Sequence, residues 1–296
     1  LETHLGWACV GMGKKIGDFV RREDLLAFLE ATLRVYNMQG RRDNAYKARI
    51  KILVHEIGTD EMKKLVEEEF AAVKARGALQ LPDAEVERIK AYFAAPAFET
   101  LPDATPELDA AIAREPAFAD WAKANVTAHR VPGYAIVNIS LKPIGKPPGD
   151  ATSDQMDAVA DIAEKYALSE IRVAHEQNLC LAHVRKKDLH AVWQALVAAD
   201  LATANVGLIT DQIACPGLDY CNLANARSIS VAERISERFA DLKRQHDIGR
   251  LHINISGCIN ACGHHHVGHI GILGVDKKGV EYYQVTLGGA ADETAS

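Results

Sequence analysis

Four cysteines fall into two close pairs in the second half of the sequence. Five residues separate Cys215 from Cys221, and three separate Cys258 from Cys262. Two pairs of thiolates can hold the irons of a [4Fe–4S] cluster, one thiolate per iron. Zinc sites favour two to four residues between paired cysteines, so the wider first pair suits zinc poorly. The spacing therefore favours an iron–sulfur cluster and leaves zinc open.

The bulk composition is that of an ordinary globular chain. It has 296 residues, 48% of them apolar, and a net charge of −6. Nucleic-acid and anionic-membrane partners normally require a basic face, which this acidic balance does not support. No run approaches the roughly 18 apolar residues of a membrane span, and no secretory signal opens the chain. We therefore expect a cytoplasmic protein, without nucleic-acid or membrane partners, whose cysteines are metal ligands or catalytic groups.

The elements that must position the cysteines are preceded by two less regular regions. Residues 1–76 contain an amphipathic helix that stops at Gln39, a basic run over 41–51 and a charged helix near 60–75. Residues 77–130 are rich in proline and alanine, which predicts a linker with short helices and a domain boundary.

Residues 131–210 show a β-α-β-β-α-β order. Alternation or short apolar runs predict the strands, and apolar residues at helical spacing predict two helices. The predicted strands are 134–141, 170–174, 179–184 and 206–210. The order matches the split βαβ unit of ferredoxin-like folds, in which two helices cover one face of an antiparallel sheet.

Residues 211–296 carry the cysteines on a mixed α/β arrangement. The first cysteine pair lies in a loop that contains proline and glycine, and a long helix is predicted after it, over about 225–244. The predicted strands are 251–255, 267–273 and 280–287. The fold class predicted for the whole chain is α+β.

The residues around the cysteines resemble the two-part signature of the sirohaem-containing nitrite/sulfite reductases. The matching stretches are Ala214-Cys215-Pro216-Gly217, Cys221-Asn222-Leu223-Ala224 and Ser256-Gly257-Cys258-Ile259-Asn260-Ala261-Cys262-Gly263. The resemblance covers about 20–75 and 125–290, and includes the strand end Ser140-Leu141-Lys142 and the turn His175-Glu176-Gln177-Asn178. It strongly favours iron–sulfur over zinc.

This resemblance implies a domain order, a cofactor set and a reaction. Residues 1–76 would end a first sirohaem-binding domain that is pseudo-symmetric with a second, which follows the linker and the ferredoxin-like half-domain. The four cysteines would hold a [4Fe–4S] cluster, and Cys262 would also bridge to the sirohaem iron, with Asn260 against the cofactors. The implied reaction is the six-electron reduction of sulfite to sulfide, or of nitrite to ammonia, in assimilatory metabolism.

The resemblance also implies roles for four cations. Arg49 and Lys51 match positions that bind the substrate anion and help to supply protons, and Lys47 and Arg227 are candidates for holding the cofactor carboxylates. For Arg227, helix capping is an equal alternative. Residues two apart on a helix diverge by about 200°, so Arg49 and Lys51 can face one site only if the helix has not begun there. On a helix, Lys47 and Lys51 would share a face.

The resemblance favours sulfite as the substrate, because nitrite-preferring members of that family tend to have a neutral residue where this chain has Lys51. No flavin or nicotinamide motif is visible, so reduced ferredoxin or a separate flavoprotein is expected to supply electrons. The rival interpretation is a non-catalytic module whose cysteines hold zinc or a bare cluster for structure or electron transfer.

Other residues form less specific patterns. The histidines that follow the last cysteine have the composition of a metal site, although the family context favours hydrogen bonds to cofactors: His264, His265, His266 and His269. Cys9 and Cys180 are expected to be small buried side chains. The glycines at 11, 13 and 17 are a weak signal for a phosphate loop. Family members are about twice this length, so the chain is interpreted as a fragment without the other half of the active site.

Overall fold

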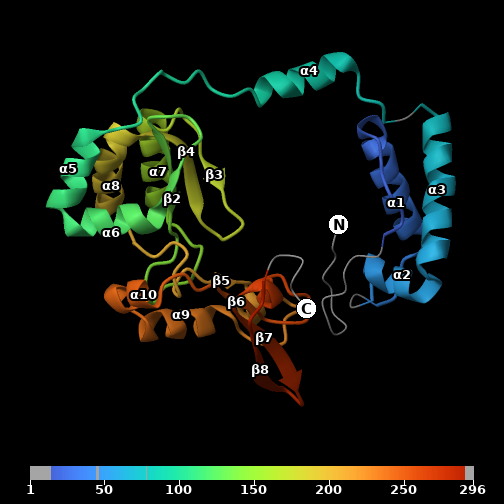
Figure 1. Cartoon of the computed structure of the whole chain (residues 1–296). Helices are drawn as coiled ribbons and strands as arrows, with labels where there is room; N and C mark the ends of the chain where they lie inside the picture. Colours follow the sequence, from blue (N-terminus) through green and yellow to red (C-terminus); the bar gives the residue numbers. More distant parts are fainter. Residues whose placement is uncertain (1–14, 45–46, 78, 291–296) are drawn as a thin grey trace. The chain divides into compact units, whose positions relative to one another are not determined.

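The computed structural model describes residues 15–44, 47–77 and 79–290, which form two compact units that divide between Ala95 and Pro96 (Figure 1). Cys9 and the glycines at 11 and 13 lie outside the described residues. Among the described helices, none is long and apolar enough to cross a membrane.

The first unit is built from helices, three of which pack their apolar faces together. The helices are α1 (Leu25–Gln39), α2 (Ile50–Ile57), α3 (Thr59–Ala75) and α4 (Asp83–Tyr92), with a 3-10 turn at Arg22–Asp24. Val35 of α1, Leu53 of α2 and Met62 of α3 meet in one buried cluster. The helices predicted up to Gln39 and near 60–75 are confirmed as α1 and α3. The basic run therefore connects α1 to α2 and ends in the first turn of α2.

The second unit begins with a ferredoxin-like half-domain. Its elements are α5 (Pro106–Arg114), α6 (Pro116–Asn125), β1 (Val126–Ala128), β2 (Tyr134–Ile139), α7 (Ser153–Tyr166), β3 (Arg172–Val173), β4 (Leu179–Arg185), a 3-10 turn (Lys186–Asp188) and α8 (Leu189–Ala198). The strands form an antiparallel sheet in the order β1-β2-β4-β3. Val137 of β2, Ile162 of α7 and Leu196 of α8 share its core.

Helices α5 and α6 lie in the stretch predicted as a linker. Each begins with a proline, whose missing N–H costs no helical hydrogen bond at that position. Phe118 and Trp121 of α6 are fully buried in the core of the half-domain. By contrast, none of the described residues of α4 is buried. The later part of the predicted linker therefore supplies core to the half-domain.

The strand predicted over 206–210 is wrong. The segment forms turns in which Gly207 has φ +77° and the Asp211 N–H donates to the Leu208 carbonyl at 2.9 Å. Asp211 Oδ2 in turn accepts the Gly207 N–H at 2.7 Å. The run is apolar because Leu208 and Ile209 are buried, and β1 takes the place beside β2 at the edge of the sheet.

A second sheet carries the cysteines. Its elements are β5 (Ile213–Ala214), a 3-10 turn (Gly217–Asp219), α9 (Ile229–Arg238), α10 (Leu242–Ile248), β6 (Ile253–Ser256), a 3-10 turn (His265–Val267), β7 (Ile270–Lys277) and β8 (Val280–Leu287). The order is β5-β6-β7-β8, with β5, β6 and β7 parallel and β8 antiparallel (Figure 1). Ala232 of α9 packs on Ile255 of β6 and Ile272 of β7. The three strands predicted from 251 to 287 are confirmed as β6, β7 and β8.

The single long helix predicted over 225–244 is wrong, because the chain forms α9 and α10 instead. Asp241 lies between them with an extended backbone, and its Oδ1 accepts the Lys243 N–H at 3.0 Å and the Arg244 N–H at 3.4 Å. Aspartate in this position starts a new helix by satisfying its first N–H groups. The helical periodicity of the sequence did not reveal this break.

A buried ion pair joins the half-domain to the segment that leads to β5. Lys142 Nζ lies 2.6 Å from Asp211 Oδ1, and the two side chains are only 2% and 3% exposed. Burial lowers the pKa of Lys142, and the charge of Asp211 opposes that effect. The Asn178 Nδ2 group donates to the same carboxylate oxygen at 3.0 Å. The turn that precedes β5 is therefore tied to the segment that follows β2 and to the β3–β4 turn.

Replacing Asp211 by Asn should lower the free energy of unfolding by about 3–5 kcal/mol, because it leaves the buried Lys142 ammonium without its counter-charge. Urea titration followed by circular dichroism measures this effect. Glu99→Gln is the control, since Glu99 forms a more exposed pair with Arg185, whose loss should change stability little. Equal stability of the two variants would contradict a structural role for the Lys142–Asp211 pair.

Candidate functional site

The two cysteine pairs begin at the carboxyl ends of neighbouring parallel strands. Ala214 of β5 pairs with Ile255 of β6, and the next residue, Cys215, donates its N–H to the Ile255 carbonyl at 3.1 Å. Cys258 lies two residues beyond the end of β6. Because parallel strands end at the same edge of a sheet, this register brings together residues that are 43 positions apart in the sequence (258 − 215).

The loop of Cys221 folds back onto the start of the Cys258 loop. The Gly257 carbonyl accepts the N–H groups of Asn225 and Ala226 at 2.8 and 3.0 Å. A Cβ atom on Gly257 would lie 2.9 Å from the Gly217 Cα, so the two loops touch main chain to main chain. Gly217 also has φ +60°, a conformation that favours glycine. The close approach of the two loops therefore depends on glycine.

Cys262 lies in a tight turn that is held from β6. Asn254 Nδ2 donates to the carbonyls of Gly263 and His264 at 3.0 and 3.1 Å, and the Gly263 N–H donates to Ser256 Oγ at 3.2 Å. Ala261 adopts a left-handed φ of +56° just before the cysteine. The side chain of Cys262 is exposed, whereas Cys258 is buried. The sequence did not indicate that Asn254 and Ser256 hold this turn, because polar residues at their positions are ordinary in a strand.

The thiols lie close enough to influence one another. Burial raises the pKa of Cys258, and the Cys215 and Cys221 thiols raise it further, while the Asn260 main chain and side chain hydrogen-bond to Cys258 and lower it. The Gly257 N–H donates to Cys215 Sγ at 3.0 Å. Hydrogen bonds of this kind stabilise the thiolates that ligate iron–sulfur clusters. This donor set fits a [4Fe–4S] cluster, and it includes Asn260, which was predicted to lie at the site.

The histidines that follow Cys262 do not converge as metal ligands. His269 Nδ1 accepts the main-chain N–H of His252 at 3.0 Å, and burial lowers the pKa of His265. Within the described part of the chain, no three or more His, Cys, Asp or Glu side chains, the four cysteines included, are placed around a single metal ion. A [4Fe–4S] cluster does not require such a group, because each of its irons takes one thiolate. Cys180 lies half-buried in β4, where burial raises its pKa.

Arg227 faces carboxylates of its own chain. Its main-chain N–H donates to Glu281 Oε2 at 2.8 Å, its guanidinium bonds to the other oxygen of Glu281, and its Nε lies 3.6 Å from Asp219 Oδ1. Tyr283 donates its hydroxyl to the Arg227 carbonyl at 2.9 Å. This network joins the start of α9 to β8. A role for Arg227 toward a cofactor stays a prediction.

The first unit brings two predicted anion-binding residues together. Arg49 has an extended backbone and precedes α2, so the helix begins only at Ile50. Burial and the charge of Arg49 lower the pKa of Lys51 to about 8. The charges of Arg49 and Lys51 are therefore close enough to repel each other. Arg49 therefore lies before the helix, as required for Arg49 and Lys51 to face one site. Lys47 is exposed in a turn before the helix, so it does not share a helical face with Lys51.

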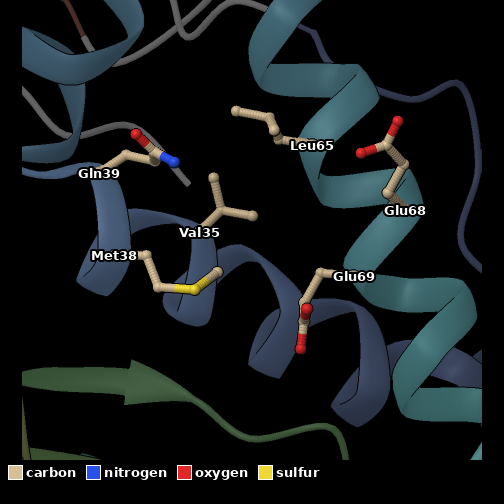
Figure 2. Close-up of a pocket in the computed structure, with 6 residues that line it drawn as sticks. All are labelled: Val35, Met38, Gln39, Leu65, Glu68 and Glu69. Carbon is tan, nitrogen blue, oxygen red and sulfur yellow. The ribbon is translucent and has the colours of Figure 1, made fainter.

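A cavity elsewhere in the first unit has different chemistry. It has a volume of about 200 Å³ and lies between α1 and α3 (Figure 2). Its lining consists of Val35, Met38, Gln39, Leu65, Glu68 and Glu69. It contains carboxylates but no cation or thiol, so it suits neither an anion nor a cluster.

Models of known protein families match both the half-domain and the domain that carries the cysteines. The family model for the nitrite and sulphite reductase 4Fe-4S domain matches residues 9–74 and 208–296, and the model for the nitrite/sulfite reductase ferredoxin-like half domain matches 144–199. The match to the second model covers α7, β3, β4 and α8, and therefore includes the β3–β4 turn; it begins two residues after Lys142.

Relatives and a solved structure extend the similarity along most of the chain. A ferredoxin–nitrite reductase of Synechococcus elongatus is 26% identical over 88% of this chain and 43% of its own length. A sulfite reductase [ferredoxin] 2 of Mycolicibacterium paratuberculosis is 25% identical over 94% and 45%. The Mycobacterium tuberculosis NirA protein has a similar fold, with a TM-score of 0.62, 21% identity, and coverage of 96% of this chain and 46% of that one.

The chain thus spans less than half the length of these relatives. The family predicted from the cysteine signature is confirmed, as are the α+β fold class and the ferredoxin-like half-domain. With more than half of its residues matched by the 4Fe-4S domain model, the chain belongs to the nitrite and sulphite reductase family.

Proposed function

We propose that the protein containing this chain reduces sulfite to sulfide, or nitrite to ammonia, with Cys215, Cys221, Cys258 and Cys262 holding a [4Fe–4S] cluster beside a sirohaem. The observation that carries the proposal is the convergence of the two cysteine loops beyond β5 and β6. The exposure of Cys262 supports its role as the thiolate shared with the sirohaem iron, because a bridging sulfur must be reached by both groups.

When bound, a [4Fe–4S] cluster and a sirohaem would supply the electrons for the reduction of the anion. Asn260 stabilises the thiolate form of Cys258, and the Gly257 N–H does the same for Cys215. Asn254 and Ser256 hold the turn that presents Cys262. These groups would hold the four thiolates in place for a cluster.

Arg49 and Lys51 are proposed to bind the substrate anion. Arg49 Nε is buried and has no hydrogen-bond partner among the described residues, so an anion would satisfy it. Two neighbouring cations repel each other, and an anion between them relieves the repulsion. The pKa of Lys51, about 8, also makes its ammonium a better proton donor than an ordinary lysine, which suits a reduction that consumes protons. Lys47 and Arg227 are proposed to assist with the cofactor carboxylates.

The names of the relatives support one electron donor over the other. Both relatives described above carry ferredoxin in their names, which favours reduced ferredoxin as the donor over a flavoprotein. We propose that the protein acts in the cytoplasm. A zinc or bare-cluster module without catalysis is not favoured, because the named relatives are reductases.

Sulfite should be turned over with a higher kcat/KM than nitrite, because sulfite has the higher charge and gains more from the two cations at Arg49 and Lys51. The assay uses the purified holoprotein with a reduced viologen as the electron donor for both anions. An absorption spectrum recorded first distinguishes the cofactors, since sirohaem gives intense Soret and red bands and a cluster alone gives a broad brown shoulder. A colourless zinc-loaded protein would contradict the proposed function, and nitrite turnover far above sulfite turnover would contradict the substrate preference.

A further inference from the structure

The side-chain amide of Gln177 pairs with the main chain of Ala214, the residue directly before Cys215. Gln177 Nε2 donates to the Ala214 carbonyl at 2.9 Å, and the Ala214 N–H donates to Gln177 Oε1 at 3.0 Å. β5 is an outer strand of its sheet, and Cys215 bonds in the other direction, to Ile255 of β6. The amide of Gln177 therefore takes the place of a neighbouring strand on the open side of β5.

Gln177 is itself held in place by the β3–β4 turn of the half-domain. It adopts a left-handed φ of +61°, which is uncommon for a residue with a side chain and is retained when the surroundings impose it. The Ala174 N–H donates to the Asn178 carbonyl at 2.9 Å and closes the turn. Gly149 packs so closely that a Cβ there would lie 3.1 Å from the Gln177 Cβ.

The residues on either side of Gln177 attach the same turn to the segment before β5. The Glu176 carbonyl accepts a hydrogen bond from Lys142 Nζ, which is paired with Asp211, and Asn178 Nδ2 donates to Asp211 Oδ1 at 3.0 Å. Three consecutive residues of the turn thus contact either the buried ion pair or β5. The amide of Gln177 is fixed relative to Ala214 by connections that do not depend on Gln177 alone.

We propose that Gln177 is a positioning residue for the iron–sulfur cluster, through which the half-domain holds Cys215 at the distance the cluster requires. The inference rests on the proposed function only in taking the four cysteines as the ligands. Ala214 is 4% exposed, so removing the amide leaves a buried N–H and a buried carbonyl without partners next to the first ligand. The hydrogen bond from Gly257 to Cys215 Sγ depends on the position of Cys215 and would weaken with it.

The test follows release of iron from the holoprotein to a chromogenic chelator. Gln177→Ala should release iron at least about tenfold faster than wild type, the effect typical of losing an outer partner of a metal ligand. The midpoint potential of the cluster, measured by redox titration, should also shift, which a loss of stability remote from the cluster would not cause. Circular dichroism verifies that the variant is folded.

Gln177→Glu separates the paired hydrogen bonds from the bulk of the side chain. A protonated carboxyl group can both donate and accept, as the amide does, whereas a carboxylate only accepts and would face the Ala214 carbonyl. Release from this variant should match wild type below the pKa of the new carboxyl and match Gln177→Ala above it. The charged groups around the turn, at Lys142, His175, Glu176 and Asp211, are the same in every variant, and wild type is measured at each pH.

Gln155 provides the matched control in the same half-domain. Its Oε1 accepts the Thr152 N–H at 3.1 Å and its Nε2 donates to the Ala199 carbonyl at 3.1 Å, so it too pairs with the main chain, at the start of α7. Gln155→Ala and Gln155→Glu should release iron at the wild-type rate.

Three outcomes would overturn the inference. One is a wild-type release rate and potential in Gln177→Ala, and another is an equal acceleration in Gln155→Ala. The third is the absence of pH-dependent rescue in Gln177→Glu. In each case the wild-type cluster would still be present, so the proposed function would stand. A wild-type holoprotein without a [4Fe–4S] cluster would overturn the proposed function and this inference together.

Discussion

Replacing Cys258 by Ser should remove the cluster from the holoprotein. Cys258 is 7% exposed and lies next to the Cys215 and Cys221 thiols. Replacing its thiol by a hydroxyl therefore leaves one iron of the cluster without its thiolate ligand. A hydroxyl is also a far weaker ligand for iron than a thiolate. Iron and acid-labile sulfide per chain should fall at least about tenfold, together with the visible absorbance of the cluster.

Cys180→Ser is the matched control for this variant. Cys180 lies half-buried in β4 of the other sheet, where burial raises its pKa and disfavours the thiolate needed for ligation. Its replacement should leave the iron content unchanged. The cluster assignment would be wrong if Cys258→Ser kept the wild-type iron content, or if Cys180→Ser lost iron to the same extent.

Anion binding should weaken as the pH rises through about 8, because the pKa of Lys51 is lowered to that value. Below pH 8 the ammonium is charged and contributes its full attraction, and above pH 8 the proton and the attraction are lost. A hydrogen bond to a charged group contributes about 1.5–3 kcal/mol, which corresponds to about 10- to 140-fold in affinity. The profile of kcat/KM for sulfite against pH measures the effect on the free protein.

Two substitutions of Lys51 separate its titration from that of other groups. Lys51→Arg keeps its charge across this range, so the fall near pH 8 should move to higher pH. Lys51→Met should have low kcat/KM at every pH and no fall near 8. Lys63→Met on α3 is the control, since Lys63 is an exposed lysine beside Glu67. If Lys51→Arg shows the same fall as wild type, another group titrates there.

The sequence allowed some elements to be predicted and concealed others. α1 was predictable because its apolar residues repeat at helical spacing, and α3 was predicted as a charged helix near 60–75. The false strand over 206–210 arose because Leu208 and Ile209 are buried within turns, and an apolar run signals burial rather than extended backbone. The break between α9 and α10 depends on one capping side chain, Asp241, in an otherwise helical pattern.

By itself the sequence predicted the ligand chemistry, because the number, type and spacing of the thiols at Cys215, Cys221, Cys258 and Cys262 favour a cluster over zinc and are local properties of the chain. The same local pattern predicted the family, and the match to the 4Fe-4S domain model confirms that prediction. It also placed Asn260 among the site residues, since Asn260 is a close neighbour of two cysteines in the sequence.

Only the tertiary structure decided how these residues meet. The parallel register of β5 with β6 brings Cys215 to Cys258. Hydrogen bonds from Gln177, in a distant segment, and from Asn254, within β6, hold the two cysteine loops. The lowered pKa of Lys51 likewise comes from desolvation and from a neighbouring charge. Distances between remote residues and removal from water depend on how the whole unit packs, and no short stretch of sequence specifies them.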